Sequence, residues 1–132
     1  MPSDSSPAAT PSVAARWTPP AVWVVLILIA TSWPGISVGP DTLALDKVFH
    51  FTAYAVLAAL LLRASSRPRL VTALAVWGIV AVFGAVDEWH QSFIPSRSMS
   101  FADWIADSSG ALVGIIVARL IPPWPRRRTA SS

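Results

Sequence analysis

The chain has 132 residues, of which 54% are hydrophobic and 13% charged, with a mean hydropathy of +0.57 and a formal net charge of +3. Its length allows one domain, and a soluble domain of this size and composition would expose large apolar patches, so an ordinary soluble enzyme is disfavoured. The absence of cysteine excludes thiol catalysis, thiolate metal sites and disulfides.

Four apolar stretches follow one another along the chain, over residues 20–38, 48–62, 70–86 and 101–121. A helix needs about 17–25 residues to cross the hydrocarbon core of a bilayer. The first, third and fourth stretches reach this length, and the second does so only if its opening turn lies inside the bundle or at the interface. None shows in its middle the 3.6-residue alternation of a soluble amphipathic helix. We therefore predict an all-α integral membrane bundle of four transmembrane helices.

The two ends of the chain differ in composition from this apolar region. We predict a disordered cytoplasmic segment over residues 1–18, a transmembrane domain over 19–121, and a basic cytoplasmic tail over 122–132. A cleaved signal peptide is the main alternative for the first stretch. It is disfavoured because the leader is long and carries a single Arg.

The distribution of basic residues predicts the orientation. Lys47 and Arg97 fall on one side with six of the seven acidic residues, and the other eight basic residues fall on the opposite side. By the positive-inside rule, both termini of this multi-pass protein should be cytoplasmic and the protein should lie in the cell membrane. The basic tail would then bind anionic headgroups of the bilayer, and no nucleic-acid partner is expected.

The outward ends of the predicted helices gather most of the remaining polar residues. On the second helix, Asp46, His50 and Tyr54 are spaced i, i+4 and i+8, so they share one face, and Lys47 lies next to them.

The third predicted helix ends with acidic residues. Gly84, Gln91 and one of the two carboxylates Asp87 and Glu88 share a face of it. Because adjacent carboxylates cannot face inward equally, we expect Glu88 to be the inner one. The connection that follows contributes Arg97.

The fourth predicted helix starts with Ser100 as its N-cap, in a variant of the capping box. One stripe of this helix then combines acidic and small residues, namely Asp103, Asp107, Gly110 or Ala111, and Gly114.

Each of these features also has an ordinary explanation. Asp103 suits a helix start through the dipole, and the GxxxG pattern indicates a close helix contact. Tyr54 fits a core aromatic, Asp46 with Lys47 a solvated helix start, and His90 a solvent-facing residue. These polar residues taken together are harder to explain in this way, because placing one ionisable side chain inside a membrane costs about 2.5–3.5 kcal/mol of free energy. We therefore expect a partnered network that faces the bundle interior.

Four segments carry a resemblance to a known family. The turn TSWP at 31–34 is similar to a Ser-Ser-x-Pro turn, and 46–54 to the signature D-K-x-x-H-x-x-x-Y. Residues 87–97 are similar to D-E-x-x-Q-x-F-x-P-x-R, and 103–110 to D-x-x-x-N-x-x-G. Over roughly residues 20–120 the chain resembles the VanZ-like proteins, small multi-span bacterial membrane proteins named after a teicoplanin-resistance factor.

The resemblance implies a four-helix membrane bundle with a role in the cell envelope. It also implies reduced susceptibility to lipoglycopeptide antibiotics of the teicoplanin type. Asp107 departs from the family pattern, because many relatives have Asn there, so any role that needs an amide donor is not carried over to this chain.

The first functional hypothesis is binding of a lipid headgroup or a peptidoglycan precursor at the outer face. Arg97 and Lys47 would hold a phosphate or carboxylate, and Trp33, Trp89 and Trp104 the lipid or sugar portion. The candidate binding residues are Asp46, Lys47, Tyr54, Gln91, Arg97, Asp103 and Asp107.

The second hypothesis is an enzyme at the membrane edge that acts on a lipid-linked or phosphorylated envelope substrate. Its candidate catalytic residues are Glu88 or Asp87 as general base and His50 as proton shuttle, with Arg97 stabilising negative charge. The third is a purely structural bundle. A proton relay or small transporter is a further alternative, although the first and third helices lack a midplane charge.

A metal site has weaker support from the sequence. Asp46, Asp87, Glu88 and Asp103 with His50 would offer hard ligands, but no H-x-x-x-H or H-E-x-x-H spacing is present. We therefore expect no metal and no cofactor, and the sequence predicts no particular oligomeric state.

Overall fold

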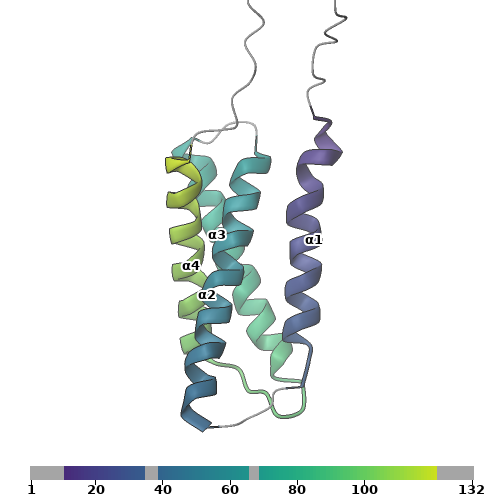
Figure 1. The fold of residues 1–132 in the computed structure, drawn as a ribbon, viewed down its shortest axis with the longest axis vertical. Helices are drawn as coiled ribbons and strands as arrows, with labels where there is room; N and C mark the ends of the chain where they lie inside the picture. Colours follow the sequence, from purple (N-terminus) through teal and green to yellow (C-terminus); the bar gives the residue numbers. More distant parts are fainter. Residues whose placement is uncertain (1–10, 35–38, 66–68, 122–132) are drawn as a thin grey trace, which may run out of the picture.

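The computed structural model describes residues 11–34, 39–65 and 69–121, and this part of the chain contains four helices and no strand. The helices run side by side along a common axis (Figure 1). Each contains a segment long and apolar enough to cross a membrane, which confirms the predicted all-helical, multi-pass architecture. The four helices are α1 (Val13–Thr31), α2 (Gly39–Ala64), α3 (Leu70–Gln91) and α4 (Phe101–Leu120).

α1 starts upstream of residue 19, where the transmembrane domain was predicted to begin. The helix begins at Val13, because the Ser12 hydroxyl accepts a hydrogen bond from the Ala15 N–H at 3.2 Å and so caps it upstream of the apolar run. Pro19 and Pro20 lie inside the helix and do not end it. Residues 13–18 of the segment predicted to be disordered are helical, and its residues 1–10 lie outside the described residues, as does the predicted tail at 122–132.

The boundary between the first two helices also differs from the prediction. α1 ends at Thr31, and the N–H of Ser32 bonds to the Leu28 carbonyl, so the first apolar stretch does not continue as helix toward residue 38. α2 then begins at Gly39 and includes the turn that carries Asp46 and Lys47, which makes it 26 residues long. The second stretch is thus long enough to span.

The contact between α2 and α4 is the most extensive one in the bundle. Small residues allow it: a Cβ added at Gly110 would overlap the carbonyl of Phe51, and one added at Gly114 would overlap the carbonyl of Ala55. The backbones of the two helices therefore lie against each other, which confirms the close contact predicted from the GxxxG pattern.

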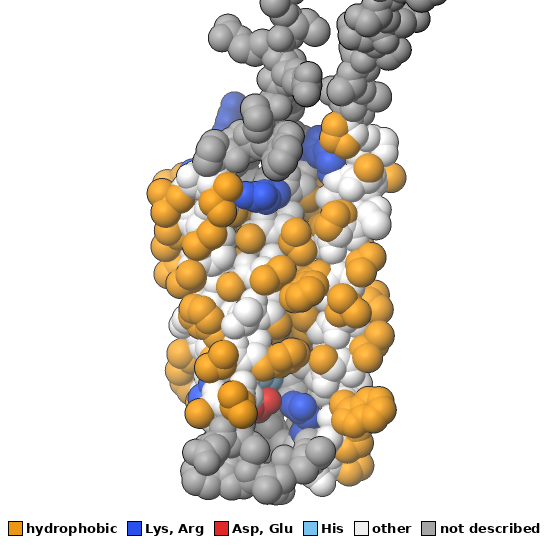
Figure 2. All heavy atoms as spheres, in the orientation of Figure 1, with side chains coloured by type: hydrophobic (Ala, Val, Ile, Leu, Met, Phe, Trp, Pro, Cys, Tyr) orange, Lys and Arg blue, Asp and Glu red, His pale blue; other side chains and the backbone are white. Residues whose placement is uncertain are grey.

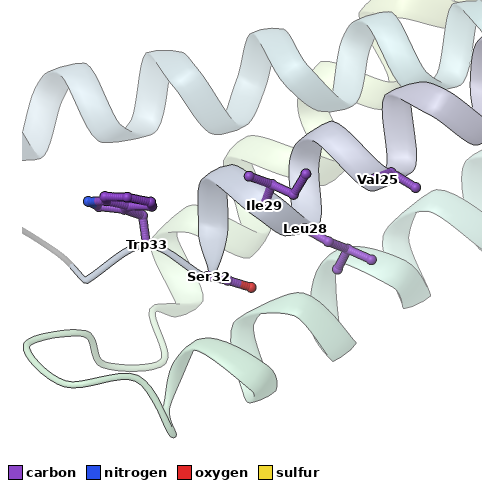
Figure 3. A pocket seen from close by; sticks show the side chains of 5 residues that line it. All are labelled: Val25, Leu28, Ile29, Ser32 and Trp33. Atoms are coloured by element: carbon purple, nitrogen blue, oxygen red, sulfur yellow. The ribbon is translucent and has the colours of Figure 1, made fainter.

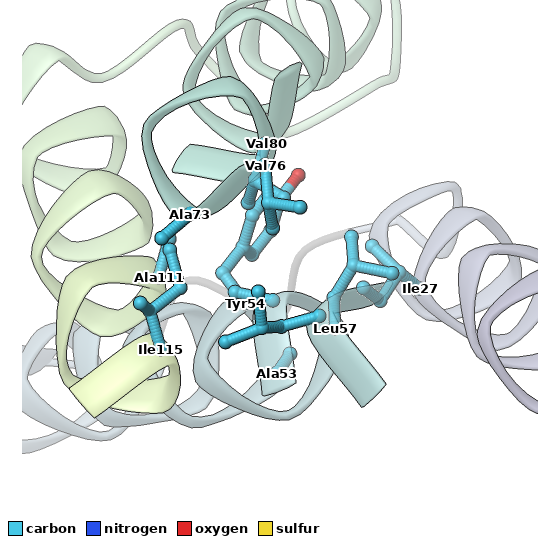
Figure 4. Packing of buried hydrophobic residues seen from close by; sticks show 11 residues of the cluster. Ile27, Ala53, Tyr54, Leu57, Ala73, Val76, Val80, Ala111 and Ile115 are labelled. Atoms are coloured by element: carbon cyan, nitrogen blue, oxygen red, sulfur yellow. The ribbon is translucent and has the colours of Figure 1, made fainter. Parts of the chain in front are cut away.

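The apolar core lies between the helices, and Tyr54 and Leu57 of α2 point into its centre, opposite Val80 of α3 (Figure 4). α1 contributes Ile27 to this core and buries few other residues. The outer faces of all four helices carry exposed large hydrophobic side chains, which cover the middle of the visible surface in Figure 2. This surface matches a lipid environment and not water.

The connections divide the bundle into two chemically different ends. α1 begins, α2 ends and α4 ends at the upper end in Figure 1, which we call the terminal end. There the Arg16 guanidinium donates from Nε to the Ala64 carbonyl at 3.1 Å. The opposite end, where α1 and α3 finish and α2 and α4 begin, is the polar end.

Candidate functional site

The polar end holds a group of hydrogen-bonded and ionisable side chains from all four helices and from the connection between α3 and α4. We call it the polar cluster. Eight of its side chains are in the buried class, although burying a polar group in a membrane is costly unless it is paired. The cluster consists of Thr31, Asp46, Lys47, His50, Tyr54, Asp87, Glu88, Gln91, Arg97, Asp103 and Asp107.

Asp87 is the centre of the first half of the cluster. Its Oδ1 accepts a hydrogen bond from the Thr31 hydroxyl at 2.8 Å, and its Oδ2 accepts one from the Tyr54 hydroxyl at 3.0 Å. The Gln91 amide donates to the same Oδ2 at 3.2 Å. Three donors from α1, α2 and α3 therefore satisfy this carboxylate, and it ties those three helices together.

His50 is the centre of the second half. Its Nδ1 lies 2.9 Å from Asp107 Oδ1 and 3.8 Å from Glu88 Oε1. The other Glu88 oxygen accepts the backbone N–H of Ser100 at 2.6 Å. Two buried atoms of this half, His50 Nε2 and Asp107 Oδ2, have no hydrogen-bond partner, so this half keeps unused binding capacity.

The two basic residues at the rim of the cluster have protein partners. Lys47 Nζ lies 2.9 Å from Asp103 Oδ1, and the Lys47 side chain is 43% exposed. Arg97 donates from Nη1 to the Gln91 side-chain oxygen at 2.8 Å and from Nε to the Trp33 carbonyl at 3.0 Å. Arg97 thus joins the connection after α3 to the end of α1.

The expectation that only one of the adjacent carboxylates Asp87 and Glu88 faces inward is wrong. Both are buried, with exposed fractions of 1% and 2%. Successive residues of a helix point about 100° apart. α3 contacts α1, α2 and α4, and Asp87 meets side chains of α1 and α2 while Glu88 meets the backbone of Ser100 before α4, so both directions meet protein.

The structure places the ten predicted site residues at one end, and it adds Thr31. Sequence analysis missed this residue as a site candidate, although it opens the TSWP segment that carries part of the family resemblance. The Ser100 hydroxyl accepts the Asp103 N–H at 3.2 Å, which confirms the predicted N-cap of α4. His90 is exposed, as expected from its place beside Trp89.

The three tryptophans predicted to contact a ligand differ in how exposed their side chains are. Trp33 and Trp89 are largely exposed at the polar end. Trp104 is half-buried, because its indole N–H donates to the Ala81 carbonyl of α3 at 2.9 Å. Of the three tryptophans, Trp33 and Trp89 are therefore the two whose side chains are largely exposed.

Two shallow apolar hollows border α1, and neither is lined by an ionisable side chain. One is lined by residues of α1 and the two residues that follow it (Figure 3), namely Val25, Leu28, Ile29, Ser32 and Trp33. The other lies between α1 and α2 and is lined by Trp23, Leu26, Ile27, Ala30, Phe49 and Ala53. The buried half of the cluster around His50 thus lines neither hollow.

The arrangement limits the chemistry of each half. Asp87 already accepts three donors, so it serves to position neighbouring helices. Glu88 and Asp107 share the single imidazole of His50, which can exchange a proton with either carboxylate or bind a ligand together with them.

Comparison with known proteins agrees with this combination of fold and polar segments. The family model described as VanZ/LLP1 matches residues 6–122, which include all four helices and every residue of the polar cluster. No curated protein and no solved structure matches the chain. Because the family model covers most of the sequence, the chain belongs to the VanZ/LLP1 family.

Proposed function

We propose that this VanZ-family protein acts in the cell envelope through its polar cluster. In this proposal the cluster faces outward and binds the polar group of an envelope component, a lipid headgroup or a peptidoglycan precursor. Binding lowers susceptibility to teicoplanin-type antibiotics. The observation that carries the proposal is the convergence of side chains from four helices on one end of an apolar bundle, where most of them are buried.

The two halves of the cluster argue against a purely structural role. The Asp87 half alone connects α1, α2 and α3 and has every carboxylate oxygen paired. Glu88 and Asp107 add two further buried carboxylates with one shared imidazole. Desolvation offsets much of the attraction in such a pair, so the second half adds little stability for its cost.

The rim provides the groups that a phosphate or carboxylate would contact. Arg97 has five N–H donors and uses two of them in its bonds to Gln91 and Trp33. Lys47 has three donors, and its side chain is 43% exposed while it contacts Asp103. Both cations can therefore take an anionic group in addition to their protein partners, and the exposed Trp33 would contact its lipid or sugar portion.

A second candidate function is acid–base catalysis on an envelope substrate. The distances of 2.9 Å and 3.8 Å from His50 Nδ1 to Asp107 and Glu88 favour it, because a histidine between two carboxylates can carry a proton. In this alternative Glu88 is the general base and His50 the shuttle. Asp87 is a positioning residue, since its three donors leave it no role in proton transfer.

Drug susceptibility of a sensitive host tests the proposal. The host would express the wild type, Glu88→Gln, Arg97→Ala or the control His90→Ala, which alters an exposed residue next to the cluster. We expect protection by the wild type and the control, and loss of protection in the other two variants at equal membrane abundance. If both variants disappear from the membrane, the cluster is a folding network and the proposal fails.

The same variants separate binding from catalysis. Glu88→Gln keeps the shape and the acceptor for the Ser100 N–H, but it removes the base. Catalysis therefore predicts complete loss of protection in Glu88→Gln. Binding predicts the larger loss in Arg97→Ala, because that change removes the donors for the anionic group.

A further inference from the structure

The geometry points to a divalent-cation site formed by His50, Glu88 and Asp107, which lie on α2, α3 and α4. One ligand atom from each of these side chains lies within 4.8 Å of the other two, and all three side chains are buried. This site goes beyond the proposed function, because it assigns the protein an inorganic ligand at its polar end.

The distances between the ligand atoms suit a metal ion. His50 Nδ1 is 2.9 Å from Asp107 Oδ1 and 3.8 Å from Glu88 Oε1. Ligand atoms bonded to one ion at about 2.0–2.2 Å lie roughly 3–3.5 Å apart. The measured distances fall on both sides of this range, so small side-chain rotations would bring the three atoms around one ion.

Unpartnered polar atoms provide an independent observation. Asp107 is fully buried and His50 is 1% exposed, yet Asp107 Oδ2 and His50 Nε2 have no hydrogen-bond partner. Buried polar atoms in native proteins are usually paired, so both side chains have binding capacity that the chain itself does not use. A cation bound by both oxygens of Asp107 would pair Oδ2, whereas His50 Nε2 lies across the ring from the ligating Nδ1 and stays outside this ligand set.

The side chains around the site carry more acidic than basic groups, which also favours a bound cation. The described cluster contains five carboxylates, Asp46, Asp87, Glu88, Asp103 and Asp107, and three basic side chains, Lys47, His50 and Arg97. Lys47 contacts Asp103, while Arg97 contacts an amide and a backbone carbonyl. Within the described part of the chain, His50 is the basic side chain within 4.0 Å of Glu88 and Asp107, and Lys47 interacts with Glu88 from farther away. A divalent cation would balance both carboxylates.

A second group of ligands indicates how the ion would enter. Asp46, His50 and Asp103 also place one ligand atom each within 4.8 Å of one another. Asp46 is half-buried at the outer edge of the cluster, and His50 belongs to both groups. An ion can therefore pass from the surface through the Asp46 and Asp103 carboxylates to the buried site.

The ligand types indicate the kind of ion. One imidazole nitrogen and two carboxylate oxygens suit Zn²⁺ or Mn²⁺, whereas a calcium site uses oxygen ligands alone. The expectation of no metal from the sequence rested on the absence of a histidine spacing motif. These ligands come from three different helices, and no local spacing can reveal such a set.

The test uses the full chain, purified in detergent through a histidine-free tag, stripped with EDTA and loaded with Zn²⁺ alone. We expect about one retained Zn²⁺ per chain in the wild type and in the control His90→Ala. Glu88→Gln and Asp107→Asn should lower the affinity by at least about 10–100-fold, with helix content and elution volume unchanged. Equal retention in all four proteins, or none in the wild type, would overturn the site.

A second measurement tests the metal site if Glu88→Gln and Asp107→Asn do not fold. The chain contains two histidines, His50 and His90, so His50 is the sole histidine of His90→Ala. Pulsed EPR of Mn²⁺ bound to His90→Ala should detect a coordinated nitrogen, and its absence overturns the proposal. Because metal binding is measured on purified protein, its failure is distinct from a failure of drug protection in cells.

Discussion

At the scale of single residues, Asp87 and Glu88 show how two neighbouring carboxylates acquire different tasks. Asp87 accepts three hydrogen bonds from side chains on α1, α2 and α3. Glu88 faces α4, where it accepts one backbone N–H from Ser100 and lies near His50. The first carboxylate is satisfied by protein donors. The second accepts a longer hydrogen bond at Oε1, from the Gln91 amide at 3.4 Å, and this oxygen also lies near His50, where it can take part in proton transfer or ligand binding.

The Asp87 half leads to a prediction about stability. Thr31→Val removes the donor to Asp87 Oδ1 with little change of shape, and we expect it to lower the free energy of unfolding by about 1.5–3 kcal/mol, as for hydrogen bonds to charged groups. Unfolding of the purified protein in a mixed-detergent titration measures this change.

The control for this prediction lies on the same helix. The Thr18 hydroxyl donates to the Ala14 carbonyl, and the Ile27 carbonyl likewise lies 2.9 Å from Thr31 Oγ1, where it shares the single hydroxyl hydrogen with Asp87. Thr18 is exposed and has no contact with Asp87. Thr18→Val should therefore leave stability nearly unchanged. Equal losses in the two variants would show that the bond to the helix backbone, and not the bond to Asp87, accounts for the effect.

Much of the candidate site follows from helical spacing alone. Asp46, His50 and Tyr54 share a face of α2, and Asp103 and Asp107 share a face of α4, as i, i+4 spacing predicts. The spacing of residues within one helix does not show which residues of a neighbouring helix their side chains contact. The pairing of Thr31 with Asp87 and of His50 with Asp107 therefore required the packed bundle.

At the scale of the helices, the packing of α2 against α4 depends on two glycines. A Cβ at Gly110 or Gly114 would overlap backbone carbonyls of α2, and backbone cannot move aside as a flexible side chain can. The same close approach brings His50 Nδ1 of α2 to 2.9 Å from Asp107 Oδ1 of α4. The packing at the two glycines therefore also supports the polar cluster.

Gly114→Ala should accordingly lower the free energy of unfolding by about 1–3 kcal/mol, the usual cost of overpacking. Gly78→Ala is the matched control, because a Cβ there meets nothing within 4 Å and alanine favours the helix. Detergent unfolding of both variants measures the difference. A loss at Gly78 as large as that at Gly114 would attribute the effect to glycine itself and not to the α2–α4 contact.

The helix boundaries show where sequence patterns are less informative. Apolar length predicted the number of membrane-spanning helices, because the bilayer thickness sets that length. The first helix nevertheless begins at Val13 and ends at Thr31, upstream of the predicted stretch at both ends. Its start depends on a cap at Ser12, and its last residue, Thr31, bonds to Asp87 of α3. Neither contact is visible in a hydropathy pattern.

At the scale of the whole molecule, an apolar middle separates two ends that carry the charged side chains (Figure 2). Among the described residues, the terminal end carries Arg16, Arg63, Arg69 and Arg119. The polar end carries five carboxylates against Lys47, His50 and Arg97. Such an asymmetry favours the cytoplasm for the terminal end and the outer face for the polar cluster.

This orientation can be tested with single cysteines, because the natural chain contains none. Ser98 is exposed in the connection between α3 and α4 at the polar end, and Ser65 follows α2 at the terminal end. Substituting either by cysteine leaves every charge in place, so the positive-inside signal is unchanged.

A membrane-impermeant maleimide should label Ser98→Cys in intact cells and Ser65→Cys only after the membrane is opened. A permeant maleimide applied to each variant controls for thiol reactivity. The reverse pattern would place the polar cluster in the cytoplasm, where an antibiotic that acts outside the membrane would not meet it. The orientation therefore decides whether the cluster can act on the outer envelope, whatever ligand it binds.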